Sequence, residues 1–171
     1  ELIGTMGDIV WSINPAKDHL GDLTQRMRRF AADILSARGI SVHFNSSDAD
    51  KTLTLKTNIR RELFLIFKGS INNIAKHSSA KNVYVDLGID HDVLSMRIRD
   101  DGKGFEIGPS SFEDTFSSEG PSGNGIKSMR KRAAEINGHF DIDSSAGSGT
   151  TTFLTLPLEF GINTTIEPNF K

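Results

Sequence analysis

A predicted helix with two chemically different sides, over residues 58–80, constrains the fold more than any other part of the chain. Its apolar residues recur about every 3.6 positions and form a side wide enough to pack against a β-sheet. A glycine and several polar residues recur at three- and four-residue spacing, so they form a second stripe that either binds a ligand or faces solvent. The apolar side contains Ile59, Leu63, Ile66, Phe67, Ile71, Ile74 and Ala75, and the stripe contains Gly69, Asn73, Lys76 and His77.

The length and composition indicate one globular domain. The chain has 171 residues, of which 36% are hydrophobic, which is enough for one sizeable core. The formal net charge of -2 argues against a nucleic-acid-binding surface. There is no cysteine, which excludes disulfides and thiolate metal sites and fits a reducing compartment. No apolar run is long enough to cross a bilayer, so we expect no membrane contact.

We expect three parts along the chain. Residues 1–15 have helical apolar spacing up to Asn14-Pro15, which predicts the last turns of an upstream helix that packs against a partner helix. Residues 16–158 are predicted to form the domain itself. Residues 159–171 show little periodicity and are predicted to be a partly disordered tail.

Within the domain, helix and strand patterns alternate. Helical spacing predicts a helix from Asp18, as its cap, to about Arg38, and another that begins at Gly123-Asn124-Gly125. His19, in the first turn, is interpreted as a surface residue rather than a phosphorylation site. Alternating apolar residues predict strands at 40–44, 52–55, 83–89, 94–98, 140–142 and 151–158, of which the third and fourth form a hairpin around residues 90–92.

A polar stretch from Glu106 to Asn124, rich in Ser, Gly and Pro, is too long for a routine connection. Segments of this length inside a compact domain are usually lids or disordered. Phe112 and Phe116 within it are either a hydrophobic latch or part of the core.

Asp100 ends a predicted buried strand and is followed by Gly102 and Gly104, which allow the backbone to turn sharply beside a flat ligand. A carboxylate at this place can accept a hydrogen bond from an exocyclic amine, which distinguishes adenine from guanine. Because Asp and Gly are common in any turn, the motif alone is also compatible with a purely structural role.

Two further groups are suited to phosphate. The helix start at Gly123 and Gly125 offers free backbone N–H groups and the positive end of a helix dipole. Asn73 can coordinate a hard cation such as Mg²⁺ through its amide oxygen, with water and phosphate oxygens completing the shell. Lys76 and His77 lie within reach of the same phosphates.

Taken in order, these motifs resemble the N, G1, G2 and closing G boxes of the ATP-binding catalytic domain of two-component sensor histidine kinases, within the GHKL (Bergerat) superfamily. The resemblance covers residues 9–158 and is closest to nitrate-sensor-like and desaturase-sensor-like kinases. The upstream phrase DIVWSINP resembles large hybrid sensors. The motifs are Asn73-x-x-Lys76-His77, Asp100-x-Gly102-x-Gly104-Phe105, Gly123-x-Gly125-Ile126 and Gly147-x-Gly149-Thr150.

The resemblance implies an α/β (α+β) two-layer sandwich of Bergerat type, with helices on one face of a mixed sheet and a short N-terminal helical remnant. It implies ATP and Mg²⁺ as ligands and γ-phosphoryl transfer to a histidine on an upstream dimerisation helix. It also implies a homodimer in the full-length protein, a response-regulator receiver domain as partner, and a cytoplasmic catalytic domain. The implied ATP-binding residues are Asn73 (also the Mg²⁺ ligand), Lys76, His77, Asp100, Gly102, Gly104, Phe105, Gly123, Gly125, Ile126 and Thr150.

One position departs from the family pattern. Relatives usually carry a glutamate four residues before the chelating asparagine, and this chain has Gly69 there. Glu62 shares the stripe but lies about 16 Å from Asn73 along the helix axis, so it cannot substitute. Two alternatives therefore stand beside the kinase: a nucleotide-binding pseudokinase module, and a GHKL-type ATPase that hydrolyses ATP with water.

Overall fold

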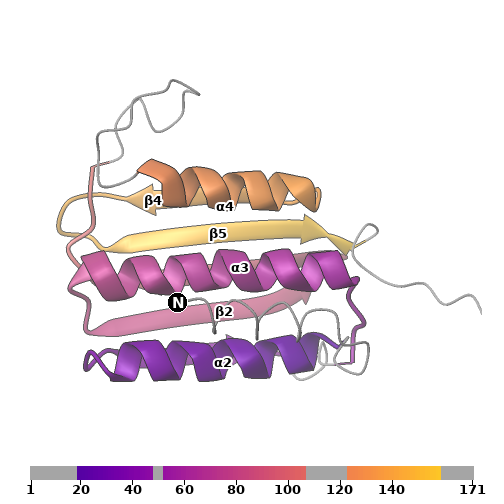
Figure 1. The fold of residues 1–171 in the computed structure, drawn as a ribbon, viewed down its shortest axis with the longest axis horizontal. Coiled ribbons are helices and arrows are strands. Elements are labelled where there is room, and N and C mark those ends of the chain that lie inside the picture. Colours follow the sequence, from indigo (N-terminus) through magenta and orange to yellow (C-terminus); the bar gives the residue numbers. More distant parts are fainter. Residues whose placement is uncertain (1–18, 48–51, 107–122, 159–171) are drawn as a thin grey trace, which may run out of the picture.

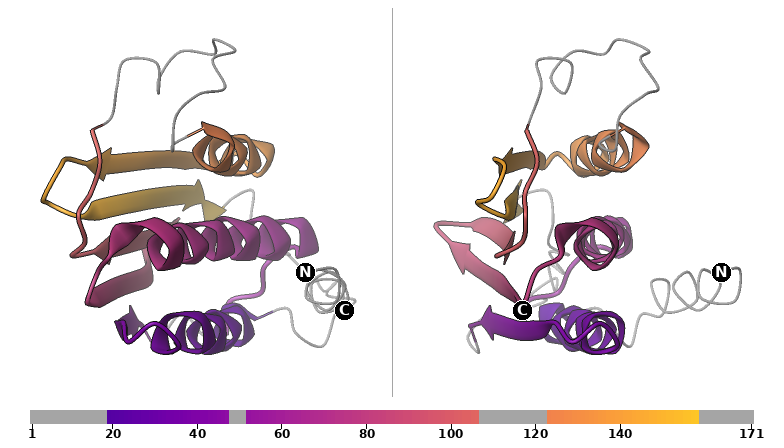
Figure 2. Two further views of the ribbon diagram at one scale, coloured as in Figure 1. Left: turned by 60° about the vertical axis from the view of Figure 1, so that its left-hand side comes forward. Right: turned by 90° about the vertical axis from the view of Figure 1, so that its left-hand side faces the viewer.

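The computed structural model describes residues 19–47, 52–106 and 123–158 of the chain. These residues form a two-layer sandwich, in which a five-stranded sheet carries its helices on one face (Figures 1 and 2). The sheet order is β1-β2-β3-β5-β4. The strands are β1 (Ser41–Ser46), β2 (Asn82–Asp90), β3 (Val93–Asp100), β4 (His139–Ser144) and β5 (Thr150–Pro157).

The sheet is mixed, as expected. β1 pairs with β2 in parallel, and every other neighbouring pair is antiparallel. A parallel pair needs a long crossover, and α3 supplies it between β1 and β2. β2 and β3 form the predicted hairpin, whose turn residues His91 and Asp92 have φ values of 46° and 60°. Such a two-residue turn matches the twist of the strands.

Three helices of the described residues lie side by side over the sheet (Figure 1). α3, the predicted central helix, packs between the other two and presents its apolar side to the sheet, with Leu63, Ile66, Phe67 and Ile71 fully buried. Burial of this apolar side holds the helix in place. The helices are α2 (Leu20–Ser36), α3 (Thr57–Asn73) and α4 (Gly123–Glu135), and a π-helix, η2 (Ile74–Ser78), follows α3 directly.

Three local predictions were wrong. The N-cap of α2 is His19 rather than Asp18, and the His19 side chain makes no capping hydrogen bond. Residues 52–55 are not a strand, since Thr54 forms only an isolated bridge with His19. The central helix does not continue as an α-helix to residue 80, because it changes to a π-helix at Ile74.

Several predictions concern residues outside the described ranges: the upstream helix at 1–15, the lid with Phe112 and Phe116, and the tail at 159–171. The division into three parts therefore stays a prediction. His19 is a surface residue, as expected. None of the helices in the described ranges is long and apolar enough to cross a membrane.

Candidate functional site

A cavity of about 470 Å³ opens where α3 and η2 end, β3 ends, and β5 and α4 begin. Eight of the residues singled out in the sequence line it: Asn73, His77, Asp100, Gly104, Phe105, Gly125, Ile126 and Thr150. The sequence analysis did not assign seven other lining residues to a site: Ser70, Ile74, Ser78, Ile98, Lys103, Ile142 and Thr152.

The missed residues make up much of the wall. Ile98 and Thr152 follow the inward positions of alternating strands, so the period of β3 and β5 could have identified them. Lys103 stands between the two glycines of the Asp100 motif and adds a cation to the rim. Isoleucine side chains on several sides make the inner part of the cavity apolar, which suits a flat heterocycle.

Asp100 is the buried acceptor of this cavity. It ends β3, is only 1% exposed, and its Oδ1 accepts a hydrogen bond from the Gly102 backbone N–H at 2.9 Å. Burial raises the pKa of the Asp100 carboxyl, while backbone hydrogen bonds from Gly102 and Thr150 partly oppose this rise. A buried carboxylate among apolar walls can recognise a ligand N–H group strongly.

The adjacent Asp101 has a structural role. Its Oδ1 accepts hydrogen bonds from the backbone N–H groups of Lys81 and Asn82, both at 2.8 Å, and its Oδ2 accepts from the Asn82 side chain at 2.8 Å. These bonds, above all those from Asn82, lower the pKa of Asp101. Asp101 therefore fixes the start of β2 to the end of β3, and Asp100 is left facing the cavity.

Two glycines allow the backbone to pass close behind Asp100. A Cβ at Gly102 would lie 2.3 Å from the Ser78 carbonyl oxygen, so no side chain fits there. Gly149 has φ +76°, and a Cβ on it would lie 2.1 Å from the Asp100 carbonyl oxygen. Both glycines are thus required by close approach, whatever the ligand.

The π-helix η2 changes the direction of the polar stripe. Asn73 and His77 line the cavity, whereas Lys76 is exposed and does not line it. Ser78 ends the π-helix, and its carbonyl oxygen accepts a hydrogen bond from the Lys103 backbone N–H at 2.8 Å. The π-helix thereby connects the segment that carries Asn73 to the turn after Asp100. π-Helical turns inside α-helices are frequent at functional sites.

Asn73 faces the start of α4. A Cβ on Gly125 would lie 3.7 Å from Asn73 Nδ2 and 3.8 Å from Oδ1, so the carboxamide lies against the first turn of that helix. The described residues contain no group of three or more His, Cys, Asp and Glu that could hold a metal ion. A Mg²⁺ ion would therefore fit here only with Asn73 as one ligand and with phosphate and water oxygens as the others.

A small hydroxyl network supports the opposite wall. Ser144 Oγ accepts a hydrogen bond from the Phe105 backbone N–H at 3.0 Å and donates to the Gly149 carbonyl oxygen at 2.9 Å. Its Oγ also lies 3.0 Å from Thr150 Oγ1. This network holds the Thr150 hydroxyl and the Phe105 backbone beside Asp100. Of the other predicted residues, Gly102 lies behind Asp100, and Gly123 begins α4.

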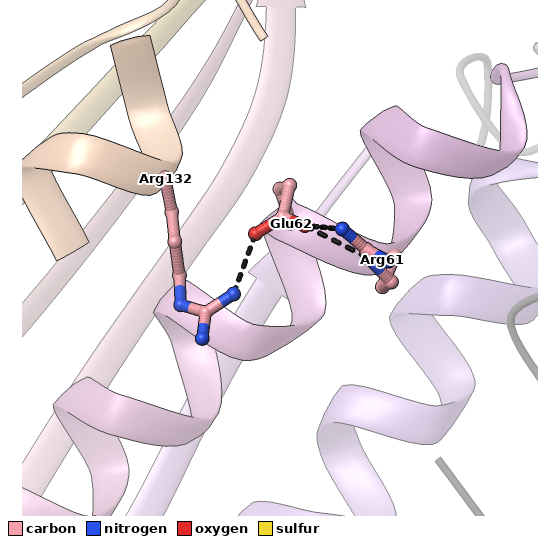
Figure 3. Close-up of polar contacts among 3 residues, drawn as sticks. All are labelled: Arg61, Glu62 and Arg132. Atoms are coloured by element: carbon pink, nitrogen blue, oxygen red, sulfur yellow. Dashed lines mark hydrogen bonds and ion pairs between the residues drawn. The ribbon is translucent and has the colours of Figure 1, made fainter. Parts of the chain in front are cut away.

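α3 and α4 run antiparallel and contact each other along their length, beginning with Asn73 and Gly125 at the cavity. In the middle, a Cβ on Gly69 would lie 3.0 Å from Met129 Sδ, so position 69 faces α4. At the far end, Arg132 donates to Glu62 Oε2 at 2.8 Å, and Arg61 lies 2.6 Å from Glu62 Oε1 (Figure 3). Arg132 therefore joins α4 to α3 through a buried carboxylate.

Comparison with known proteins places these motifs in a family. The family model described as "Histidine kinase-, DNA gyrase B-, and HSP90-like ATPase" matches residues 58–160. The sensor protein VraS of Staphylococcus epidermidis is 38% identical over 100 residues, and that of Staphylococcus aureus is 37% identical. These matches cover 58% of this chain and 26% of either sensor protein, so the chain spans about a quarter of the length of these relatives.

Solved structures confirm the predicted fold class. Full-length ShkA in complex with AMPPNP gives a TM-score of 0.64 at 18% identity, covering 85% of this chain and 30% of that one. The catalytic domain of histidine kinase ThkA gives 0.63 at 12% identity, covering 81% of this chain and 93% of that one. At such identities the likeness concerns the fold alone.

Proposed function

The chain belongs to the family of histidine kinase-, DNA gyrase B- and HSP90-like ATPases, and we propose that it binds Mg-ATP as the catalytic domain of a two-component sensor kinase. The observation that carries the proposal is Asp100, a carboxylate buried at the inner wall of an apolar cavity of about 470 Å³. Its environment fits an adenine ring whose exocyclic amine donates to the carboxylate.

The proposed base pocket follows from the lining residues. Asp100 accepts from the adenine amine, Gly104 forms the floor with Gly102 behind Asp100, and Phe105 and Ile126 pack against the ring. The Thr150 hydroxyl, held by Ser144, lies near the base. In support, Asp100 is 1% exposed and the Thr150 and Ser144 hydroxyl oxygens lie 3.0 Å apart.

The proposed phosphate end lies between η2 and the start of α4. Asn73 holds Mg²⁺ through its amide oxygen, and Lys76 and His77 contact the phosphates. Gly123 and Gly125 offer backbone N–H groups at the α4 N-terminus. When bound, the metal ion would neutralise phosphate charge and orient the γ-phosphoryl group for in-line transfer.

In the full-length protein, we propose that the γ-phosphoryl group passes to a histidine on an upstream dimerisation helix. The described residues contribute positioning and electrostatic stabilisation, which dominate phosphoryl transfer. The partners would be a second copy of the full-length chain and a response-regulator receiver domain. The motifs favour a nitrate-sensor-like or desaturase-sensor-like hybrid sensor whose catalytic domain is cytoplasmic.

A pseudokinase is the second candidate, because a specific observation favours it. The family resemblance implies a glutamate at the position of Gly69, and a Cβ on Gly69 would lie 3.0 Å from Met129 Sδ of α4. Position 69 therefore supplies no carboxylate for proton transfer beside Asn73. Such a module would bind nucleotide and signal by conformation alone. An ATPase of the gyrase or chaperone type is less favoured, because it needs the same carboxylate.

Calorimetric titration of the chain with AMPPNP, with and without Mg²⁺, tests the proposed function. We expect saturable binding that Mg²⁺ strengthens, and no comparable binding of the guanine analogue GMPPNP. Absence of AMPPNP binding by the folded chain would refute the proposal. Phosphorylation of the upstream histidine by the full-length protein then separates the kinase from the pseudokinase.

A further inference from the structure

The face of the sheet opposite the helices is uncovered in the described part of the chain (Figure 2). Two large hydrophobic side chains of that part are exposed, Tyr84 at 44% and Phe153 at 40%, and both belong to this open face. Tyr84 is on β2, where its ring stacks on that of His43 at 4.8 Å. Phe153 lies in the middle of β5, so it places an exposed aromatic side chain on this face between β3 and β4.

The strand register places opposite charges on the two sides of β5, which lies between β3 and β4. In one cross-strand row, Arg99 of β3 and Asp143 of β4 flank Thr151. In the next row on the same face, Arg97 and Asp141 flank Phe153. Positive charge therefore lies along one side of β5, and negative charge lies along the other.

Two of these charges are not used inside the described part of the chain. Arg99 and Asp143 are exposed, and neither forms a hydrogen bond or ion pair with another described residue. Arg97 differs, since it donates to Asp86 at 2.8 Å and 3.1 Å. Arg99 and Asp143 are thus the pair available to another molecule.

We propose that this face binds the same face of a second copy of the chain, with the two-fold axis parallel to β5. Such an axis exchanges β3 with β4, so Arg99 lies over Asp143 of the partner subunit, and Asp143 lies over Arg99 of the partner subunit. Phe153 lies near the axis and packs against its own counterpart. A single patch that is self-complementary in this way is what a two-fold interface requires.

Known sheet packing fits this arrangement. Two sheets packed face to face lie about 10 Å apart with strands aligned within about 30°. An arginine side chain spans most of that gap and reaches a carboxylate on the opposite sheet. A standard interface buries roughly 800 Å² per partner. Because the proposed contact uses only the outward side chains of β3, β5 and β4, we expect a weak and concentration-dependent dimer. The nucleotide cavity lies on the helix side of the sheet and stays open.

Sedimentation velocity of the whole chain over a concentration series tests the proposal. We expect a monomer–dimer equilibrium for the unchanged chain. Arg99→Asp and Asp143→Arg each place two like-charged pairs across the axis, so each weakens the dimer by about tenfold or more. In an equimolar mixture of the two variants, the heterodimer has only opposite charges across the axis, so association should be restored. A double variant that carries both Arg99→Asp and Asp143→Arg should associate for the same reason.

Lys131→Glu, which reverses an exposed charge on α4, is the matched control and leaves association unchanged. Thermal unfolding and the far-ultraviolet circular dichroism spectrum of each variant verify that its fold is intact. A chain that stays monomeric at every concentration overturns the proposal. A dimer that neither reversal weakens also overturns it, because the contact would then lie elsewhere in the chain. Since the cavity is not involved, the result is independent of the proposed ATP binding.

Discussion

Arg132 of α4 donates a hydrogen bond at 2.8 Å to Glu62 of α3, at the end of the helix pair that is farthest from the cavity. The Glu62 side chain is 2% exposed. Because glutamate is almost never fully buried unless it is paired, this carboxylate needs its arginine partners. Arg61 supplies the other partner (Figure 3). The ion pair fixes how α4 lies against α3, and α4 contributes Gly125 and Ile126 to the cavity at its other end.

Glu62→Gln should therefore destabilise the domain. The substitution keeps the shape of the side chain but leaves two guanidinium groups without their carboxylate. We expect the free energy of unfolding to fall by about 2 kcal/mol, since both arginines keep some contact with water. Urea denaturation measures this change. Glu135→Gln, at an exposed position of α4, is the control and should change stability by less than about 0.5 kcal/mol.

Asp100→Asn should weaken AMPPNP binding by about tenfold or more, because the proposed charge-assisted hydrogen bond to the adenine amine would become a neutral one. The fold should be preserved, since an amide oxygen can still accept the bond from the Gly102 N–H. Titration calorimetry measures the affinity. Asp92→Asn, in the exposed hairpin turn, is the matched control, and equal affinities for the two variants would refute the base contact.

The raised pKa of Asp100 gives a pH dependence with a definite sign. Burial disfavours the ionised form, so the folded-state pKa lies above the ordinary value of 3.8. As pH rises from the unfolded-state pKa through the folded-state pKa, the folded chain gives up its proton at a cost, and stability falls. The stability of Asp100→Asn minus that of the unchanged chain should grow with pH over this range. Chemical denaturation at several pH values measures the difference, and a difference that shrinks with rising pH would contradict the assignment.

Asn73→Ala should abolish the strengthening of AMPPNP binding by Mg²⁺ and leave the metal-free affinity nearly unchanged. The reason is that Asn73 is the proposed protein ligand of the ion, whereas the base contacts lie elsewhere in the cavity. Titrations with and without Mg²⁺ measure the ratio of the two affinities. Asn72→Ala, at the preceding position of the same helix, is the control. A Mg²⁺ effect that persists in Asn73→Ala would exclude this residue as the ligand.

Much of the fold follows from local sequence patterns. Strict alternation predicted β2 and β3, and the polar residues around His91 predicted their turn, because both signals depend only on neighbouring residues. Asp100 with Gly102 could be identified in the same way. The prediction of a strand at 52–55 was wrong, because an alternating run becomes a strand only when a neighbouring strand is present to pair with it.

The remaining features depend on contacts between distant residues. The π-helix at Ile74–Ser78 is tied to the Lys103 backbone N–H, far along the chain, so helical periodicity could not reveal it. Glu62 and Arg132 are 70 positions apart, and each alone looks like an ordinary surface charge. Likewise, only the packing of α4 shows that Gly69 faces Met129.

Gly69 provides the sharpest test of catalysis. In the full-length protein with the proposed upstream histidine helix, Gly69→Glu introduces the carboxylate that the family resemblance implies. Met129 Sδ, the flexible end of a side chain, lies 3.0 Å from the position of the new Cβ and has to shift. If the unchanged protein is a pseudokinase, Gly69→Glu should raise histidine phosphorylation by about 100-fold, the usual contribution of a general base. Gly69→Ala places the same Cβ against Met129 without a carboxylate, so it separates packing from chemistry and should give no such gain. If radiolabelled ATP phosphorylates the unchanged protein as fast as Gly69→Glu, the missing carboxylate is not needed and the kinase assignment stands.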